Sequence, residues 1–343
     1  MPSSTGGELK EAMQVVNPEQ SAADINITDF LSVPELFQLD LQSPPCLIDK
    51  FLWEGDNALI IAPEKSGKSI LSFQMALALV SGKPFLGSYK VLKPVQVAYI
   101  HTEGKIAQTR DWLTRMLEDQ SPEIARQLFY KNYPSLSLDT REGLYLLLAD
   151  LAKRSITPKV MFFDSLYHCM KGKLTDDLDA RRFTESMRVL IQKFDCSIVI
   201  NHHFHRDRHN KDGELIEEGD NAIFGSFVWK AHADHTFRLK LNKKTKHATL
   251  DCETQRSGEV ITGLKLRLQQ PNNLGFIIED ISARGKVLET LNEVKEGCSC
   301  EDIEKATRLS KRTIYRALDD LLESKQVTKN EANRPVIYSV FRK

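Results

Sequence analysis

Apolar residues in the first two thirds of the chain form short uninterrupted runs, separated by stretches in which they recur every three or four residues. The runs end at Ile61, Ile100, Phe163 and Ile200. Each run predicts a strand buried on both faces. The helical spacing between them falls in 70–80, 109–120, 144–152 and 182–194. Strands that alternate with helices predict an α/β fold with a mainly parallel twisted sheet and crossover connections.

The pattern of apolar and polar positions changes twice after this α/β region. From residue 233 onward, alternation predicts short strands near 234–241, 247–254, 260–268 and 275–280, which extend the sheet or cap its edge. After residue 283 helical spacing returns. We therefore expect three parts: a flexible polar arm over 1–40 with a short helix near 33–37, a main α/β core over 41–283, and a small domain over 284–343.

Composition excludes several classes of protein. The 343 residues are 41% hydrophobic, which is enough for a sizeable core, and the formal net charge is zero. Any nucleic-acid contact must then come from local basic patches. The six cysteines form no paired framework, and Cys298-Ser299-Cys300 lacks a second pair, so reduced thiols are expected. Without a signal pattern or a run of membrane-spanning length, we expect a cytoplasmic protein.

The run that ends at Ile61 continues into Ala62-Pro63-Glu64-Lys65-Ser66-Gly67-Lys68-Ser69-Ile70. This spacing fits the nucleotide-binding P-loop pattern G-x-x-x-x-G-K-[ST], with Ala62 in place of the first glycine. Backbone N–H groups and a helix N-terminus then face a phosphate chain, so 62–70 is predicted to bind ATP. Lys68 is expected to reach the β- and γ-phosphates, and the Ser69 hydroxyl to bind Mg²⁺. The alternative, a chance match in a surface loop, does not explain the flanking strand and helix.

Two carboxylates follow later apolar runs. Asp164 ends the run Val160-Met161-Phe162-Phe163 and is the expected second Mg²⁺ ligand. Glu103 follows the run that ends at Ile100, on a strand that we expect beside the P-loop strand. Ligands collect at this edge of open α/β sheets. Glu103 is therefore predicted to deprotonate the attacking water, and a solvated loop glutamate is the alternative.

A pair of histidines, His202-His203, comes directly after Asn201 at the same predicted edge. His205 and His209 lie nearby, but the cluster lacks the ordered spacing and companion ligands of a zinc site. A strand-end residue that senses the γ-phosphate is favoured over a structural pair, and a structural pair over zinc.

The order of these motifs resembles that of the RecA-type ATPases and, within them, the RepA-like hexameric replicative helicases (AAA_25-type). The matching residues are Ala62 to Ser69, Glu103, Phe162 to Ser165, Cys196 to His203, and Gly225-Ser226. The resemblance covers roughly residues 45–280. It implies that Glu103 is the catalytic base, that Asp164 holds Mg²⁺ through water, and that His203 or His202 reports the phosphate state. It also implies a homo-hexamer with ATP between subunits.

A polar insert over 204–220 separates His203 from Gly225. Its plain interpretation is a solvated mobile loop. In RecA-like rings the corresponding loops face the central channel, so the resemblance implies that Arg206, Arg208 and Lys211 contact single-stranded nucleic acid.

A ring also implies an arginine finger supplied by the neighbouring subunit to the γ-phosphate. Arg256, at a predicted hairpin tip, is the first candidate, and Lys244 and Arg238 are the alternatives. Basic residues at turns are usually solvated, which is the competing interpretation for all three.

Residues 284–343 combine three predicted helices with a terminal hairpin, an order that resembles a winged-helix domain. Ser299 with Asp302 suggests a capping box, and Ser310 is expected to cap the third helix. In this fold the third helix enters the DNA major groove and the wing meets phosphates. The implied contacts come from Lys311, Arg312, Tyr315, Arg316 and Arg334. Residues 285–343 hold 12 Lys and Arg against 10 Asp and Glu, so protein docking is the alternative.

The favoured function is an ATP- and Mg²⁺-dependent motor, a RepA-like hexameric DNA helicase of a plasmid, phage or related mobile element. Its partners would be single-stranded DNA in the ring channel and duplex DNA at the winged helix, with no membrane. One alternative is a non-translocating RecA-like DNA-dependent ATPase, such as a recombination mediator or a regulatory switch. The other is a DNA-binding regulator whose P-loop turns nucleotide over slowly.

Overall fold

The structure is a computed structural model of the chain, and it describes residues 31–38, 44–118, 120–203, 226–255, 261–270, 273–279, 282–294, 297–330 and 335–341. The chain divides into two compact units, Met1–Ser43 and Pro44–Lys343. In the first unit, helix α2 covers Val33–Gln38, where a short helix is expected. Most of the predicted flexible arm, and the predicted boundaries of the parts after residue 43, remain predictions.

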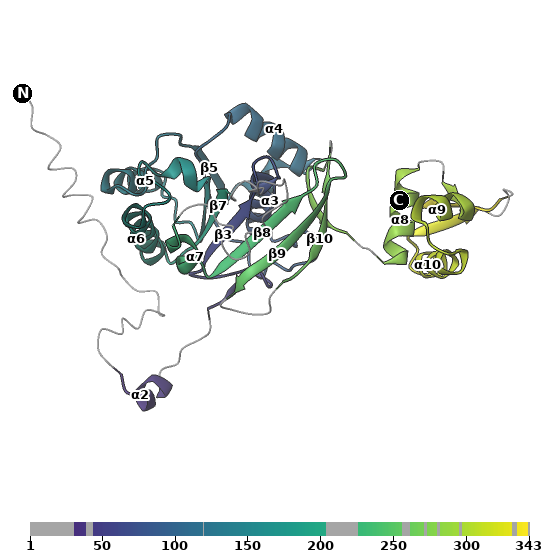
Figure 1. The fold of residues 1–343 in the computed structure, drawn as a ribbon, viewed down its shortest axis with the longest axis horizontal. Helices are drawn as coiled ribbons and strands as arrows, with labels where there is room; N and C mark the ends of the chain where they lie inside the picture. Colours follow the sequence, from purple (N-terminus) through teal and green to yellow (C-terminus); the bar gives the residue numbers. More distant parts are fainter. Residues whose placement is uncertain are drawn as a thin grey trace, which may run out of the picture. The chain divides into compact units, whose positions relative to one another are not determined.

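A nine-stranded sheet forms the centre of the second unit, with the order β11-β10-β9-β8-β3-β7-β6-β4-β5 (Figure 1). Its strands are β3 (Asn57–Ala62), β4 (Val97–His101), β5 (Leu128–Asn132), β6 (Val160–Asp164), β7 (Ser197–His203), β8 (His235–Leu241), β9 (His247–Gln255), β10 (Leu264–Gln269) and β11 (Gly275–Ile278). Pairings from β8 across to β5 are parallel, and those from β8 to β11 are antiparallel. The predicted α/β class with a mainly parallel sheet is confirmed, and the later short strands extend this sheet.

Helices cover both faces of the sheet (Figure 1). The helices are α3 (Lys68–Ser81), α4 (Ile106–Leu117), α5 (Arg141–Lys153), α6 (Asp177–Phe194) and α7 (Val228–His232), with short 3₁₀ helices η1 (Pro122–Ala125) and η2 (Leu166–Cys169). Side chains of α3 and α4 pack into one core, and those of α5, α6 and α7 pack into another.

Strand β3 contributes to both cores by simple alternation. Ala58, Ile60 and Ala62 belong to the core under α3, whereas Leu59 and Ile61 belong to the core under α5 and α6. This is why the strand before the P-loop is an uninterrupted apolar run. The start of the loop is therefore fixed from both sides of the sheet.

The expected position of the Glu103 strand is wrong. Strand β4 does not lie beside β3, because β7 and β6 stand between them. A parallel crossover fixes the handedness of a connection but not the number of strands that it passes over. Strand β4 follows β3 in the chain, whereas β6 and β7, which come later in the chain, lie between them in the sheet. Edge strand β5 was also not predicted, because its half-exposed residues Leu128–Asn132 show no buried apolar run.

The C-terminal part of the second unit has its own helices and sheet. These are α8 (Ala283–Glu293), β12 (Cys298–Ser299), α9 (Cys300–Thr307), α10 (Lys311–Glu323), β13 (Val327–Asn330) and β14 (Ile337–Val340), with strand order β12-β14-β13. Val287, Leu291, Ile303, Ile314 and Leu321 lie in a hydrophobic cluster of this part alone. The predicted capping box of Ser299 and Asp302 is present, and Ser310 accepts the Thr313 N–H.

Strands β1 (Cys46–Ile48) and β2 (Leu52–Trp53) form an antiparallel pair before β3. Among the helices that the structure describes, none combines the length and the apolar character needed to cross a membrane.

Candidate nucleotide-binding site

The turn between β3 and α3 is built by backbone geometry that the sequence requires. Lys65 and Gly67 both have left-handed φ values, 58° and 88°. A Cβ on Gly67 would lie 2.8 Å from the Cζ atom of Phe276, which is fully buried on β11. A side chain at this position would also obstruct the approach of the loop backbone to phosphates. The structure adds a second reason, since β11 packs directly against the loop.

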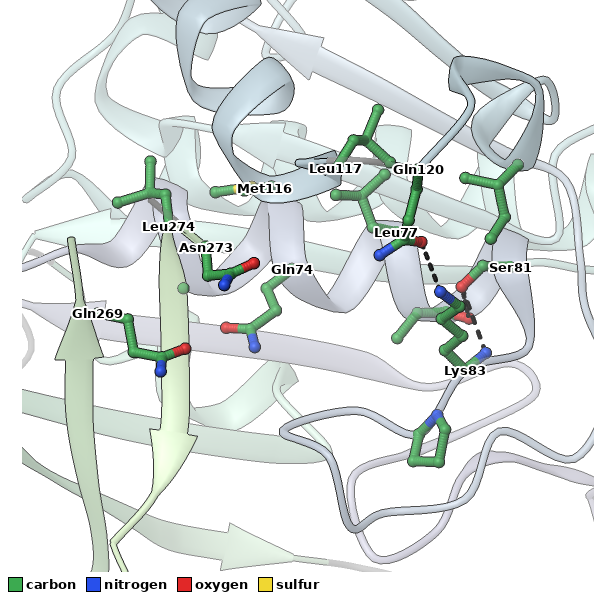
Figure 2. Close-up of a pocket in the computed structure, with 14 residues that line it drawn as sticks. Gln74, Leu77, Ser81, Lys83, Met116, Leu117, Gln120, Gln269, Asn273 and Leu274 are labelled. Atoms are coloured by element: carbon green, nitrogen blue, oxygen red, sulfur yellow. Dashed lines mark hydrogen bonds between the residues drawn. The ribbon is translucent and has the colours of Figure 1, made fainter. Parts of the chain in front are cut away.

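The position of Phe276 is set by a side-chain clamp on α3. The Gln74 amide donates from Nε2 to the Phe276 carbonyl at 2.7 Å and accepts the Phe276 N–H at 2.8 Å. Gln74 lies in the wall of a cavity of about 230 Å³ between α3, the end of α4 and the turn before β11. Leu77, Met116, Gln120 and Leu274 also line this cavity (Figure 2). The cavity borders the clamp, toward the C-terminal half of α3.

Lys68 is the first residue of α3 and is buried inside the loop. Its Nζ donates to the carbonyls of Ala62 at 2.9 Å and Pro63 at 3.1 Å. Burial lowers the pKa of Lys68, and the negative charges of Asp164 and Glu103 oppose this effect. The charges of Asp164 and Glu103 therefore both act on Lys68.

Asp164 ends β6 and is almost completely buried, at 1% exposed. Its Oδ2 accepts a hydrogen bond from the Tyr99 hydroxyl at 2.8 Å, and the Nε2 of His101 lies 3.9 Å from the same oxygen. Its Oδ1 has no hydrogen-bond partner among the described residues. A buried carboxylate oxygen without a partner needs an explanation, and a bound cation or its water shell supplies one.

The available ligands fit Mg²⁺. Ser69, half-buried at the second residue of α3, and Asp164 offer the hard oxygen atoms that this ion prefers. Within the part of the chain that the structure describes, no three His, Cys, Asp or Glu side chains converge on a metal position. Mg²⁺ does not require such a cage, because it is usually held by one or two protein oxygens together with substrate phosphates.

A buried polar network behind Asp164 was missed by the sequence reasoning. The Tyr99 hydroxyl also shares a hydrogen bond of 2.7 Å with the Ser72 hydroxyl, which accepts from the Asn201 Nδ2 at 2.9 Å. Burial and the charge of Asp164 raise the pKa of Tyr99 well above its usual range, so this phenol stays a donor. The available signal was a tyrosine and a histidine, Tyr99 and His101, inside an otherwise apolar buried run.

Glu103 lies two residues past the end of β4 and is partly exposed. Its Oε2 is 3.2 Å from the Nε2 of His168, a residue that the sequence reasoning did not single out. The site thus receives Glu103 from a strand that is not a neighbour of β3. Its charge still acts on Lys68.

The histidine pair His202-His203 ends strand β7. The backbone of His203 pairs with Ala62, at the start of the P-loop. His202 is fully buried, and its ring centroid lies 6.3 Å from that of Trp229 on α7. A sensor role for either residue remains a prediction.

Several predicted contact residues lie outside the described residues: Arg206, Arg208, Lys211, Arg256 and Arg334. Of the alternative finger residues, Arg238 forms an ion pair with Glu253. At the β8–β9 turn, Lys243 rather than Lys244 donates to the P-loop, with its Nζ 3.3 Å from the Glu64 carbonyl.

On α10, Lys311 is 3.4 Å from a carboxylate oxygen of Glu301 and 3.8 Å from one of Glu304. Arg312, Tyr315 and Arg316 are exposed on the same helix. The described part of the predicted DNA-binding helix is therefore accessible, but acidic side chains of α9 neutralise its first cation.

Comparison with protein families gives a match over this site. The model of AAA_25, an AAA domain, matches residues 27–209, which is more than half of the chain. The chain belongs to the AAA_25 family. As an AAA_25 protein it carries an AAA domain, with the P-loop after β3 and a buried acidic residue at the end of β6.

Solved structures give weaker likenesses to this AAA_25 protein. The RadB recombinase is 18% identical with a TM-score of 0.43, over 66% of this chain and 91% of that one. A KaiC-like protein of the hyperthermophilic archaeon Pyrococcus horikoshii OT3 is 13% identical with a TM-score of 0.44, over 68% and 93%. A third structure, of an isolated ATPase domain, is 10% identical with a TM-score of 0.47, over 66% and 86%. The sequence matches no curated protein.

Proposed function

We propose that this protein hydrolyses ATP to drive movement on nucleic acid, as a RepA-like hexameric DNA helicase of a plasmid, phage or related mobile element. The observation that carries the proposal is that the chain segments bearing Lys68, Asp164 and Glu103 follow or end parallel strands at one edge of the sheet, where the charges of both carboxylates act on Lys68. A cation, a metal-binding carboxylate and a second carboxylate are the parts that phosphoryl transfer to water requires.

Each part has a separate task in the proposed reaction. Loop residues 62–70 would bind the phosphates of ATP, with Lys68 leaving the Ala62 and Pro63 carbonyls to reach the β- and γ-phosphates. Ser69 and the unpartnered Oδ1 of Asp164 would hold Mg²⁺, which neutralises charge that develops on the phosphates. Glu103 would orient the attacking water and accept its proton.

The nucleic-acid part of the proposal rests on the predicted basic residues. Arg206, Arg208 and Lys211 would contact a single strand, and Arg256 would reach the γ-phosphate of a neighbouring subunit. Arg312, Tyr315 and Arg316 on α10, with Lys311 and Arg334, would contact duplex DNA in a winged-helix arrangement. The three-stranded sheet beside the α8–α10 helices supports that arrangement.

The decisive experiment measures ATP hydrolysis and unwinding of a forked duplex by the full chain, with its mass from light scattering. Lys68→Ala should abolish both activities, and Glu103→Gln should lower kcat at least about a hundredfold while nucleotide still binds. Lys90→Ala, which changes an exposed lysine outside the site, is the matched control.

The outcomes separate the candidate functions. Unwinding by a hexamer-sized species supports the helicase. DNA-stimulated hydrolysis without strand separation supports the recombination mediator or the switch. A Glu103→Gln variant as active as the unchanged protein would favour the slow-turnover regulator and sink the assignment of the base.

A further inference from the structure

His168 lies within hydrogen-bond distance of the proposed catalytic base, yet none of the steps above uses it. Its Nε2 is 3.2 Å from Glu103 Oε2, and the two side chains are 42% and 35% exposed. His168 belongs to η2, which begins two residues after Asp164. The segment that supplies the metal-binding carboxylate therefore also supplies a partner for the base.

The position of His168 is fixed by its neighbours. Leu166 and Cys169, which flank it on η2, are fully buried, and the Cys169 carbonyl accepts the Leu138 N–H at 2.7 Å. The His168 N–H donates to the Ser165 carbonyl at 3.2 Å. The Tyr167 ring stands edge-on to the imidazole, with centroids 5.0 Å apart. The imidazole is thus carried by an anchored turn and not by a free loop.

Among the charged groups near His168, Glu103 is the carboxylate that pairs with its imidazole. The imidazole also borders a cavity of about 660 Å³ lined by 134–137, 167–168 and 170–175, whose charged lining side chains are Lys171 and Lys173. The nearby carboxylate of Asp139 accepts the backbone N–H groups of Lys171 and Gly172. Among these groups, Glu103 is the one that pairs with the imidazole.

We propose that His168 is a positioning residue for Glu103, an inference that rests on the proposed role of Glu103 as the base. The Nε2 of His168, 3.2 Å from Oε2, pairs with that oxygen and restricts the rotation of the carboxylate. The other oxygen, Oε1, is then directed to take the proton of the attacking water. A base without this constraint would sample geometries that are not productive, and small misplacements are costly in rate.

The step balances without transfer of the imidazole proton. The water oxygen forms a bond to the γ-phosphorus, and the bond from that phosphorus to the bridging oxygen breaks. Its electron pair leaves with ADP. The proton lost by water moves to Glu103 Oε1, while His168 keeps its own proton and its contact with Oε2. His168 acts through Glu103 and does not touch the reacting atoms.

The test compares three full-length proteins in steady-state ATP hydrolysis: unchanged, His168→Ala and His168→Gln. Ala removes the donor and should lower kcat about tenfold with KM for ATP unchanged. Gln places a neutral N–H donor near the same position and should restore kcat to within about threefold of the unchanged protein. Equal losses in both variants, or no loss in His168→Ala, would overturn the proposal.

A double-mutant cycle separates failure of this inference from failure of the proposed function. In a Glu103→Gln background, His168→Ala should change kcat by less than about twofold, because its effect passes through Glu103. A tenfold loss that persists there makes His168 structural. If Glu103→Gln alone retains full hydrolysis, it is the assignment of the base that fails.

Discussion

The Tyr99 hydroxyl connects three elements of the site through its hydrogen bonds. It donates to Asp164 on β6 and shares a hydrogen bond with Ser72 on α3, which in turn binds Asn201 on β7. One oxygen of the Asp164 carboxylate is therefore occupied, and the other is left for a cation. Such outer hydrogen bonds orient metal ligands and tune their affinity.

Tyr99→Phe should weaken Mg²⁺ binding while the fold is preserved. The ring would keep its stack on Phe73, whose centroid is 3.8 Å away, but Asp164 would lose its fixed orientation. We expect the Mg²⁺ concentration for half-maximal binding of a fluorescent ATP analogue to rise about 10- to 100-fold. Tyr130→Phe is the control, since that hydroxyl bonds His101 and Thr109 but not Asp164. An unchanged Mg²⁺ requirement in Tyr99→Phe would contradict the orienting role.

The thiols give a second prediction at the residue scale. All six cysteines are free, and burial raises the pKa of both Cys169 and Cys196 to about 12. Because the thiolate is the reactive form, a disulfide reagent at pH 8 should modify these two residues only as the protein unfolds. Fast modification in the native protein should therefore account for fewer than six thiols, and guanidinium should release all six. Fast modification of all six thiols in the native protein would contradict the burial of Cys169 and Cys196.

Short-range patterns explain which site residues were predictable. Lys68 and Ser69 follow from a loop signature of eight residues, and Asp164 from its place at the end of an apolar run. Tyr99 and His168 were missed because their partners, Asp164 and Glu103, lie 65 residues away in the chain. Only the three-dimensional strand order brings those pairs together.

At the scale of elements, the contact between α3 and β11 fixes the P-loop. Phe276 packs under Gly67, and Gln74 holds the Phe276 backbone by two hydrogen bonds. These residues are about 200 positions apart, so the sequence offered no signal for the contact. The antiparallel strands that extend the sheet therefore support the nucleotide-binding loop.

Gly67→Ala should lower stability more than a matched glycine change. Both Gly67 (φ 88°) and Gly87 (φ 73°) are left-handed, so alanine costs about 1–2 kcal/mol of strain at either. At Gly87 the added Cβ meets no atom within 4 Å, whereas at Gly67 it would meet the Phe276 ring. We expect the free energy of unfolding, from urea titration, to fall by at least about 1 kcal/mol more in Gly67→Ala. Equal losses would mean that the ring moves aside freely.

Strand order is the part of the fold that local patterns could not predict. The periodicity predicts β3, β4, β6 and β7 because each is an uninterrupted apolar run. It does not say that β6 and β7 insert between β3 and β4, because that depends on packing of the crossover helices. Edge strand β5 escaped notice for a related reason, since a half-exposed strand needs no apolar run.

At the scale of the whole molecule, the C-terminal helices and sheet have a hydrophobic cluster distinct from the two cores of the large sheet. Leu321, fully buried in that cluster, is the side chain to truncate. Leu321→Ala should destabilise this part by about 2–5 kcal/mol, because burial is lost and a cavity remains. Calorimetry should show that one unfolding transition moves to lower temperature in the variant. A second transition should stay at the temperature it has in the unchanged protein and should move to higher temperature when ATP is added. A single transition that moves as a whole would argue against an independent domain over 284–343.

The strand order β3-β7-β6-β4 also sets the distance between the two ends of the site. Neighbouring strands lie about 4.8 Å apart, so the ends that carry Lys68 and Glu103 are separated by about three such steps, roughly 14 Å. That span is set by the peptide backbone and not by any side chain. Substitutions within the strands can accumulate without changing the distance between the ends of the site. Gain or loss of one whole strand between β3 and β4 would change it by a full step.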